Sequence, residues 1–372
     1  MHIPFCVKKC PYCDFYSITD TSLEPRFISA VISEMDMICN LPFKFDTLYI
    51  GGGTPSVLET ELITRIIETA SGLYKLLPDS EITIEVNPGT VQPEKLREYK
   101  NAGVNRISIG VQSFQENNLN FLGRIHTVKD ADLAIKWARD AGFENIAIDL
   151  IYGIPGQTRE TWLCDLEQAV LYEPEHLSCY MLTFESGTPM EKNLQKGSFK
   201  PMGGKKVGEL FTATIEFLTG KGYAQYEISN FARAKNLRSR HNQKYWSFAP
   251  YIGLGPSAHS FIKPKRCWNK TSVTAYIKDL EEGRIPIDGQ EVLSKEQMMT
   301  ESIFLGLRKA DGIDVSKFNS IFDENFFKIF EKQIDNFEKK GLMVTNQTSC
   351  ALTVKGMLFL DSITSMLVSQ DF

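Results

Sequence analysis

The apolar residues follow two alternating patterns along the chain. Five short β-rich runs each end in a polar or glycine-rich turn: FDTLYIGGG (45–53), EITIEVNPG (81–89), NRISIGVQS (105–113), NIAIDLIYGIPG (145–156) and HLSCYMLTFE (176–185). Between them, apolar residues recur at spacings of three and four, as on one face of a helix, in the ranges 27–35, 62–70, 131–138 and 162–170. Strands that alternate with helices in this way predict parallel βαβ units.

The segment HIPF at the start of the chain adds a further strand, which gives about six. The predicted fold class is therefore α/β, with an incomplete (βα)6-type barrel over residues 1–185. Polar and glycine-rich residues follow nearly every strand. Because parallel α/β folds build their sites at the carboxyl ends of the strands, we expect the functional site at that edge.

The pattern changes after residue 185. We expect an extension of the barrel over 186–288, with a helix near 203–220, a strand-like stretch at 223–229 and a long irregular region that contains HNQKYW (241–246). Residues 289–372 read as a separate small α+β module, in which helical segments precede a hairpin with its turn near 346–349. Helices followed by a hairpin resemble a winged helix.

Composition and charge narrow the class of protein. The chain has 372 residues, 42% of them hydrophobic, and a net charge of −5, so it can bury a large core and is not a general nucleic-acid binder. No window reaches 18 uncharged apolar residues, which predicts no transmembrane helix. Lys8 and Lys9 interrupt any apolar run at the N-terminus, so we expect a cytoplasmic protein.

Three of the eight cysteines, Cys6, Cys10 and Cys13, fall within eight residues. A cubane iron–sulfur cluster usually takes four thiolates, so three would leave one iron open to bind a small molecule. One alternative is structural zinc with His2 as the fourth ligand, although Cys3His sites commonly use two separate pairs of ligands. The other alternative is a set of incidental reduced thiols. The remaining five cysteines read as ordinary buried thiols.

The motif HIPFCxxxCxxC and the following GGGTPS resemble radical S-adenosylmethionine (SAM) enzymes, and more narrowly the oxygen-independent coproporphyrinogen III oxidase family. GVQSF (110–114), LIYGIPGQT (150–158) and GLGPSAHSF (253–261) extend the resemblance over nearly the whole chain. It implies a [4Fe–4S] cluster on the three cysteines, with the open iron binding SAM. In that family one electron from the cluster cleaves SAM to a 5′-deoxyadenosyl radical.

The glycine-rich loop after the second strand is the first candidate SAM contact. Without side chains, Gly51, Gly52 and Gly53 can approach a ligand closely and donate backbone N–H groups; a flexible turn is the alternative. The resemblance implies that this loop, with Thr54, meets the SAM amino group.

Four further residues lie at the carboxyl edge of later strands or just beyond it. By resemblance they match SAM-contacting positions: Glu85, Gln112, Arg124 and Asp149. A solvated strand-end carboxylate is the alternative for Glu85, and His126 beside the arginine reads as structural.

The chain departs from the oxidase at Asp14 and Phe15, because the oxidase carries a further cysteine two residues after the triad. Asp-Phe here resembles the HemW-type haem-chaperone branch of the family. HNQKYW also fits the HNxxYW motif of that branch, which is associated with haem binding. His241 is thus a candidate haem ligand, with His259 a weaker one; a packed, hydrogen-bonded histidine is the alternative for His241.

A third departure lies at the start. Family members carry a tyrosine two residues before the histidine of HIPFC, whereas His2 here follows Met1 directly. We expect the native chain to begin further upstream.

Three functions are open at this point. The favoured one is a haem chaperone that binds the cluster, SAM and haem and has haem-accepting proteins as partners, with membrane-associated acceptors one option. The alternative is an enzyme, coproporphyrinogen III dehydrogenase. A nucleic-acid binder that uses the small module is disfavoured, because its helix near 324–340 carries both charge signs. The sequence identifies neither the electron donor nor the acceptor.

Overall fold

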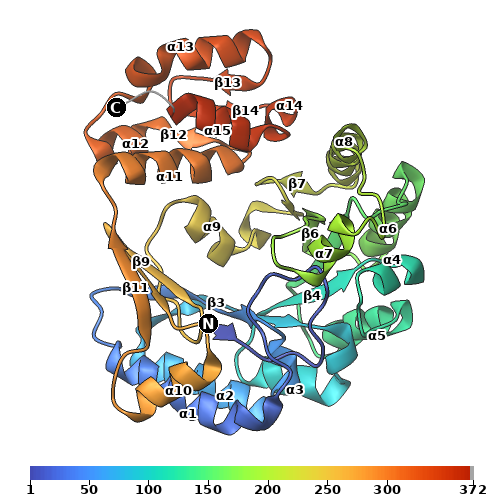
Figure 1. Cartoon of the computed structure of the whole chain (residues 1–372), viewed down its shortest axis with the longest axis vertical. Coiled ribbons are helices and arrows are strands. Elements are labelled where there is room, and N and C mark those ends of the chain that lie inside the picture. Colours follow the sequence, from blue (N-terminus) through green and yellow to red (C-terminus); the bar gives the residue numbers. More distant parts are fainter. Residues whose placement is uncertain (369–372) are drawn as a thin grey trace.

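The computed structural model describes residues 1–368. An eight-stranded sheet forms the lower part of the molecule in Figure 1, in the order β1-β2-β3-β4-β5-β6-β8-β7. Strands β1 to β6 run parallel, whereas β8 and β7 are antiparallel additions. The bounds are β1 (His2–Ile3), β2 (Phe45–Gly52), β3 (Leu76–Val86), β4 (Arg106–Gln112), β5 (Ile146–Tyr152), β6 (His176–Met181), β7 (Ala224–Gln225) and β8 (Asn230–Ala232). The predicted six-stranded partial barrel is confirmed.

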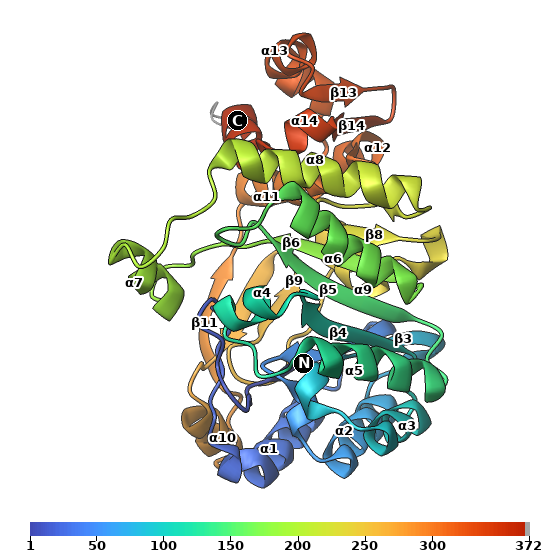
Figure 2. The same ribbon diagram turned by 90° about the vertical axis from the view of Figure 1, so that its right-hand side faces the viewer.

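Helices cover the outer face of this sheet (Figures 1 and 2). They are α1 (Glu24–Met37), α2 (Thr60–Leu73), α3 (Pro93–Asn101), α4 (Glu116–Phe121), α5 (Val128–Asp140), α6 (Arg159–Leu171) and α8 (Gly204–Gly220), while α7 (Pro189–Gln195) projects apart from them at the left of Figure 2. Capping boxes at Thr127 and Thr158 begin α5 and α6, which satisfies N–H groups that a helix start leaves unpaired. Apolar stripes read from the sequence are buried, as Ile63, Ile66 and Ile67 of α2 show.

The strands present apolar residues outward and polar residues inward. Ile84, Ile107 and Ile148 are fully buried against the helices. The neighbouring positions Glu85, Ser108 and Asp149 line a central cavity instead. Because successive side chains of a strand point to opposite faces, this alternation gives the barrel a polar interior. A closed (βα)8 barrel is filled mainly by Val, Ile and Leu, so the polar interior marks this partial barrel as a binding site.

The extension returns to the barrel. It contains α9 (Arg240–Trp246), α10 (Val273–Glu281) and a small sheet of β9 (His259–Ile262), β10 (Lys265–Asn269) and β11 (Ile287–Val292). The prediction of an irregular region around HNQKYW was wrong, because these residues form most of α9. Ser239 caps that helix by accepting a bond from the Asn242 N–H at 3.2 Å.

The C-terminal module lies above the barrel in Figure 1. It comprises α11 (Lys295–Arg308), β12 (Ile313–Asp314), α12 (Val315–Phe322), α13 (Phe326–Lys339), β13 (Met343–Thr345), β14 (Ser349–Leu352), α14 (Val354–Met357) and α15 (Leu360–Val368). The predicted hairpin is confirmed, and β12 joins it in a three-stranded antiparallel sheet. The division of the chain at 186 and 289 remains a prediction. No helix within 1–368 is long and apolar enough to cross a membrane.

The first strand is held from both sides. Gly51 and Gly53 donate N–H bonds to the carbonyls of Met1 (3.1 Å) and Ile3 (2.7 Å). On the other side His2 donates its backbone N–H to the carbonyl of Leu254 at 2.8 Å. The loop that carries Leu254 is itself tied to α1, because the buried Glu34 carboxylate accepts the N–H of Gly255 at 2.8 Å. The GLGPS motif therefore fixes the strand that precedes the cysteines.

Gly53→Ala tests this attachment. A Cβ at Gly53 would stand 2.6 Å from the Phe5 carbonyl oxygen and 2.8 Å from that of Ile3, and backbone atoms cannot rotate away. We expect a loss of about 1–3 kcal/mol in the free energy of unfolding, measured by urea titration. The matched control is Gly72→Ala in α2, where a Cβ meets nothing within 4 Å and helix propensity predicts a small gain. Equal stability of the two variants would contradict the close approach.

Candidate functional site

The three cysteines lie on one loop directly after β1. Cys6 is buried, whereas Cys10 and Cys13 are half-buried, and none of them forms a disulfide. The loop is folded by backbone bonds from the Cys6 N–H to the Ile18 carbonyl (2.9 Å) and from the Cys13 N–H to the Cys10 carbonyl (3.1 Å). Burial raises the pKa of the Cys13 thiol, and the neighbouring Cys10 and Cys6 sulfurs raise it further. The three sulfurs are therefore close enough to interact.

Two side chains from other elements donate toward these sulfurs. The Thr54 hydroxyl lies 3.3 Å from Cys6 Sγ, and Nη1 of Arg124 lies 3.4 Å from Cys10 Sγ. Hydrogen bonds to the sulfurs stabilise the negative charge of a thiolate-ligated cluster. The loop thus has both the ligands and the donors that an iron–sulfur cluster requires.

The same geometry disfavours zinc. His2, the proposed fourth zinc ligand, places its Nε2 2.8 Å from the Tyr16 carbonyl instead. In a cubane each thiolate binds a different iron, so the sulfurs need not meet at one point. The residues fit a three-cysteine cluster better than a single ion.

A cavity of about 940 Å³ opens beside the cysteine loop. This volume lies at the upper end of the range for small-molecule sites. Cys13 is at one end, and residues of the C-terminal module close the other. Seven of the nine sequence-predicted SAM or haem contacts line this first cavity: Gly52, Gly53, Thr54, Glu85, Gln112, Arg124 and Asp149. Gly51 and His241 do not line it.

Two of the carboxylates that line this cavity, those of Glu85 and Asp149, are held by neutral donors. Glu85 accepts bonds from the Tyr49 hydroxyl (2.7 Å) and the Gly52 N–H (3.1 Å), and Asp149 accepts one from the Ser108 hydroxyl (3.0 Å). Burial raises the pKa of Glu85, and the charge of Asp149 adds to the rise. Oriented carboxylates of this kind can accept hydrogen bonds from an ammonium group or from ribose hydroxyls.

The Arg124 side chain and the Gln112 backbone are each held in a defined conformation. Arg124 donates from Nη2 to the Gly110 carbonyl at 3.0 Å, while Nη1 lies between Cys10 and Tyr12. Gln112 has a φ of +68°, which is unusual for a residue other than glycine, and the pairing of β4 with β5 shifts register just before it. A bulge at a strand end re-aims a side chain, here into the cavity.

The N–H groups of the glycine loop are bonded within the fold, whereas the predicted contact of the loop with SAM stays a prediction, and Gly52 and Gly53 line the first cavity. The N–H groups of Gly51, Gly53 and Thr54 bind carbonyls of residues 1–5, and that of Gly52 binds Glu85. The prediction that these N–H groups donate to a ligand was therefore wrong. The glycines are needed because β1 and Glu85 approach the loop too closely for any side chain.

His241 belongs to α9 and packs its ring against β2 of the barrel. Its Nδ1 lies 3.1 Å from the Thr47 hydroxyl, its Nε2 lies 3.1 Å from the Tyr245 hydroxyl, and its ring stacks on Tyr49 at 4.7 Å. Burial lowers its pKa to about 3. Neither ring nitrogen is free in this arrangement, which matches the packed histidine considered as the alternative.

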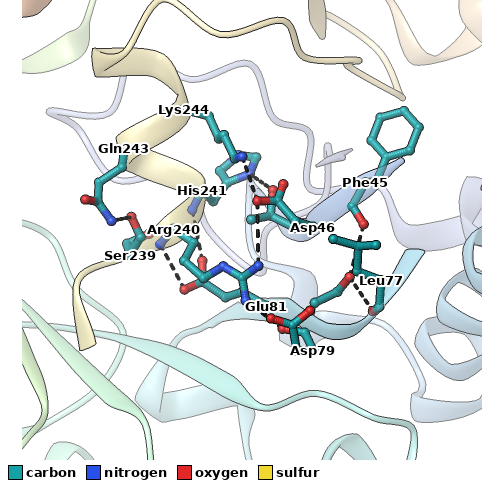
Figure 3. A network of polar contacts seen from close by, with 12 residues as sticks. Phe45, Asp46, Leu77, Asp79, Glu81, Ser239, Arg240, His241, Gln243 and Lys244 are labelled. Carbon is teal, nitrogen blue, oxygen red and sulfur yellow. Dashed lines mark hydrogen bonds and ion pairs between the residues drawn. The ribbon is translucent and has the colours of Figure 1, made fainter. Parts of the chain in front are cut away.

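Figure 3 shows how α9 is fixed to the sheet. The Glu81 carboxylate of β3 accepts the N–H groups of Arg240 (2.9 Å) and His241 (3.0 Å) at the start of the helix, where the helix dipole favours an anion. Asp46 of β2 pairs with Lys244 (2.6 Å) and Arg240 (3.6 Å). These bonds hold the HNQKYW segment against the strand edges.

Sequence reasoning missed several residues of the first cavity. Tyr12 contacts Arg124, Tyr49 orients Glu85, and Arg106 lines the cavity from the first position of β4. Their inward positions in alternating strands were a usable signal for Tyr49 and Arg106. Arg308 lines the cavity from α11, and no local pattern in the sequence indicates that contact.

Comparison with known proteins places this site. The model of the Radical SAM superfamily matches residues 1–168, and that of the HemN C-terminal domain matches 293–359. The Heme chaperone HemW of Bacillus subtilis is 34% identical over 96% of this chain and 95% of its own. The protein of the same name from Escherichia coli is 33% identical over 100% and 97%. The chain belongs to the HemW family of radical SAM proteins.

A solved structure supports the fold. The coproporphyrinogen III oxidase HemN of Escherichia coli superposes with a TM-score of 0.84 over 99% of this chain and 88% of its own, at 24% identity. Both the partial barrel and the small C-terminal region are thus shared architecture. Membership of a radical SAM family implies a [4Fe–4S] cluster and SAM.

Serine substitution tests the cluster ligands. We expect Cys6→Ser, Cys10→Ser and Cys13→Ser each to abolish most iron and sulfide incorporation after anaerobic reconstitution, because each removes one of only three thiolates. The matched control is Cys164→Ser, which changes an exposed free cysteine and should leave incorporation unchanged. Full incorporation in a triad variant would exclude that cysteine as a ligand.

The buried histidines predict sensitivity to acid. Burial lowers the pKa of His2 and His126 to about 4 and that of His241 to about 3, so these rings stay neutral in the fold while the unfolded chain takes up protons below about 6.5. The stability they contribute is full above pH 6.5 and is lost as the pH falls toward these values. Each histidine contributes a slope of up to about 1.4 kcal/mol per pH unit.

Urea unfolding between pH 7 and 5.5 measures this dependence. His241→Gln should show a shallower loss than the wild type. The exposed His259, whose pKa burial lowers less, provides the comparison, since His259→Gln should change the slope less than His241→Gln does. Identical slopes for wild type and His241→Gln would show that His241 titrates normally in the folded chain.

Proposed function

We propose that the chain is a haem chaperone that holds a [4Fe–4S] cluster and SAM in the first cavity, binds haem and delivers it to acceptor haemoproteins. The observation that carries the proposal is similarity over the whole length to proteins named heme chaperone HemW, at 33–35% identity in four bacteria. When bound, the cluster and SAM supply one-electron chemistry at the mouth of the cavity.

Asp14 and Phe15 support chaperoning over oxidation. Both line the first cavity just past Cys13, at the place where the oxidase pattern has a cysteine. Phe15 is 68% exposed, which is unusual for a large apolar side chain and leaves it free to contact a ligand or a partner. Phe15 thus stands where the oxidase pattern has its further cysteine.

A second cavity, of about 680 Å³, is the proposed haem site. Its walls come from α9, the β9 sheet, α11 and α15, and they are mainly aromatic and apolar: Tyr245, Trp246, Phe248, Tyr251, Phe261, Phe304 and Leu305 among them. Trp246 Nε1 and the Thr364 hydroxyl are buried there without hydrogen-bond partners. An apolar cavity with a few unpaired donors suits a large flat ligand with polar edges.

Helix α9 separates the two cavities. Asn242 lines the first, whereas Tyr245 and Trp246 line the second. The HNxxYW motif therefore contacts both proposed ligand sites through one short helix. Haem iron in proteins is bound by His, Cys, Met or Tyr. Tyr245 and Tyr251 line the second cavity and are therefore candidate ligands that require no rearrangement of the chain.

The haem-ligand role predicted for His241 requires a change in its partners. The imidazole would have to give up its contact with Thr47 or with Tyr245 before a nitrogen could reach iron. We retain the role as a proposal and test it separately from the cavity.

The alternative function is oxidation of coproporphyrinogen III. The HemN-like fold favours it as a second candidate, although a likeness of 24% identity shows the fold alone. Anaerobic incubation of coproporphyrinogen III with SAM and a reductant decides between the two, since formation of protoporphyrinogen IX would establish the enzyme.

Haem titration of the reconstituted protein tests the second cavity. Phe304→Arg places a charge in its apolar wall and should weaken haem binding at least ~10-fold. The matched control is Leu171→Arg, which changes a 71% exposed leucine on the barrel surface and should bind haem normally. Normal haem affinity in Phe304→Arg would show that haem does not bind in the second cavity. Absence of haem binding in the wild type would contradict the chaperone function.

Two further variants examine His241 in the same titration. Tyr245→Phe frees Nε2, so it should strengthen binding if the imidazole is the ligand and weaken it if Tyr245 is. His241→Ala should weaken binding only in the first case. Loss of affinity in both variants with normal affinity in Tyr251→Phe would point to the His241–Tyr245 pair as a unit.

A further inference from the structure

Arg106 carries a buried charge that the chain does not pair. It is the first residue of β4 and is 2% exposed, yet it lines the first cavity. It precedes Ser108 by two residues, which places its backbone roughly 7 Å deeper in the barrel. Its Nε has no hydrogen-bond partner. Within residues 1–368, no carboxylate oxygen lies within 4.0 Å of its guanidinium.

Two other partly buried arginines of this chain are paired with carboxylates, and Arg124 of the same cavity bonds Cys10, Tyr12 and the Gly110 carbonyl instead. Arg139 contacts both oxygens of Glu175 at 2.8 and 2.9 Å, and Arg266 binds Glu301 at 2.5 Å. A guanidinium remains ionised at any ordinary pH, and an ion buried without a partner is strongly unfavourable. Arg106 thus differs from its counterparts in a way that folding alone does not explain.

The groups around Arg106 are engaged with one another. Asp149 lies near enough for the charge of Arg106 to oppose the rise that burial causes in its pKa, but its carboxylate already accepts a bond from Ser108. His176 and Tyr226 bond each other at 2.7 Å, and burial keeps the pKa of His176 low, so the imidazole is neutral. His176 and Tyr226 carry no compensating charge, and Asp149 interacts with the guanidinium across more than hydrogen-bond distance, without a direct ion pair.

We propose that the inner end of the first cavity is a carboxylate site anchored by Arg106, and that it receives a second ligand beside SAM. A monoanion fits better than a phosphate, because Glu85 and Asp149 line the same cavity and would repel a dianion more strongly. The guanidinium fork matches a carboxylate in a bidentate way.

The remaining walls indicate the body of that ligand. Ile151, Leu182 and Phe211 line the cavity from the barrel side, and Met357 and Leu360 line it from the C-terminal module. Arg308 of α11 faces the same cavity with an unpartnered Nε, although Glu227 binds its Nη2 at 3.3 Å. The ligand class is therefore an acid whose carboxylate is attached to a large apolar body, as in a porphyrin with propionate side chains.

The test compares free acids with their esters. The anaerobically reconstituted protein, saturated with SAM, is titrated with coproporphyrin III and its tetramethyl ester, and with haem and its dimethyl ester. Arg106→Met should weaken binding of a free acid at least ~10-fold, leave the ester unchanged and leave the SAM affinity within about two-fold. The arm that shows the difference, coproporphyrin or haem, identifies the source of the carboxylate.

The matched control is Arg97→Met, which removes an exposed arginine paired with Glu94 at 3.2 Å and should bind all probes normally. The melting temperature of ligand-free Arg106→Met should equal or exceed that of the wild type, because the variant removes an unpaired buried charge. If Arg106→Met does not fold, Arg106→Lys keeps the charge and loses the fork, and should still weaken binding of the free acid.

Three results would overturn the proposal: free-acid affinity unchanged in the Arg106 variants, an equal loss for acid and ester, or a matching loss of SAM affinity. The outcome is separable from the proposed chaperone function. If haem binding depends on Phe304 and not on Arg106, the chaperone function stands. The titration with coproporphyrin III and its ester then decides alone whether Arg106 binds a carboxylate.

Discussion

The attachment of residues 1–6 to the glycine loop is the constraint on which the rest of the structure depends. Three backbone bonds, from Gly51, Gly53 and Thr54, hold the short strand β1 and thereby fix where the cysteine loop begins. No side chain fits between the two segments, so glycine is required for steric reasons. The GLGPS loop, bound to Glu34, closes the other side of β1. A chelating loop positioned by backbone bonds on both sides can hold three sulfurs at the edge of the cavity.

The barrel has a polar interior because its parallel strands do not close into a complete barrel. Six parallel strands do not close, so inward positions line a cavity where apolar filling would otherwise be needed. Neutral donors such as Tyr49 and Ser108 satisfy the two carboxylates. Helix α9 is held at one edge of the barrel by Glu81 and Asp46, and it stands between the first cavity and the second. The small module completes both cavities, which explains why the two parts occur in one chain.

Much of this could be predicted from the sequence, because the signals are local. The alternation of strands and helices predicted the barrel, and most of the predicted SAM contacts line one cavity beside the cysteine loop, although their roles stay predictions. The helix at HNQKYW was missed because its stability comes from Glu81 and Asp46, which are distant in sequence. The role of the glycine N–H groups was misjudged for the same reason: their partners are backbone carbonyls of β1. Arg106 looked like an ordinary strand residue, since its missing partner is visible only in three dimensions.

The central claim is that Cys6, Cys10 and Cys13 hold a cluster with one iron open to the first cavity. Electron paramagnetic resonance of the reduced, anaerobically reconstituted protein, recorded before and after addition of SAM, tests it most directly. The account predicts a [4Fe–4S] signal that SAM alters, because SAM reaches the open iron from the cavity. A protein that binds only zinc, or a cluster signal that SAM leaves unchanged, would contradict it.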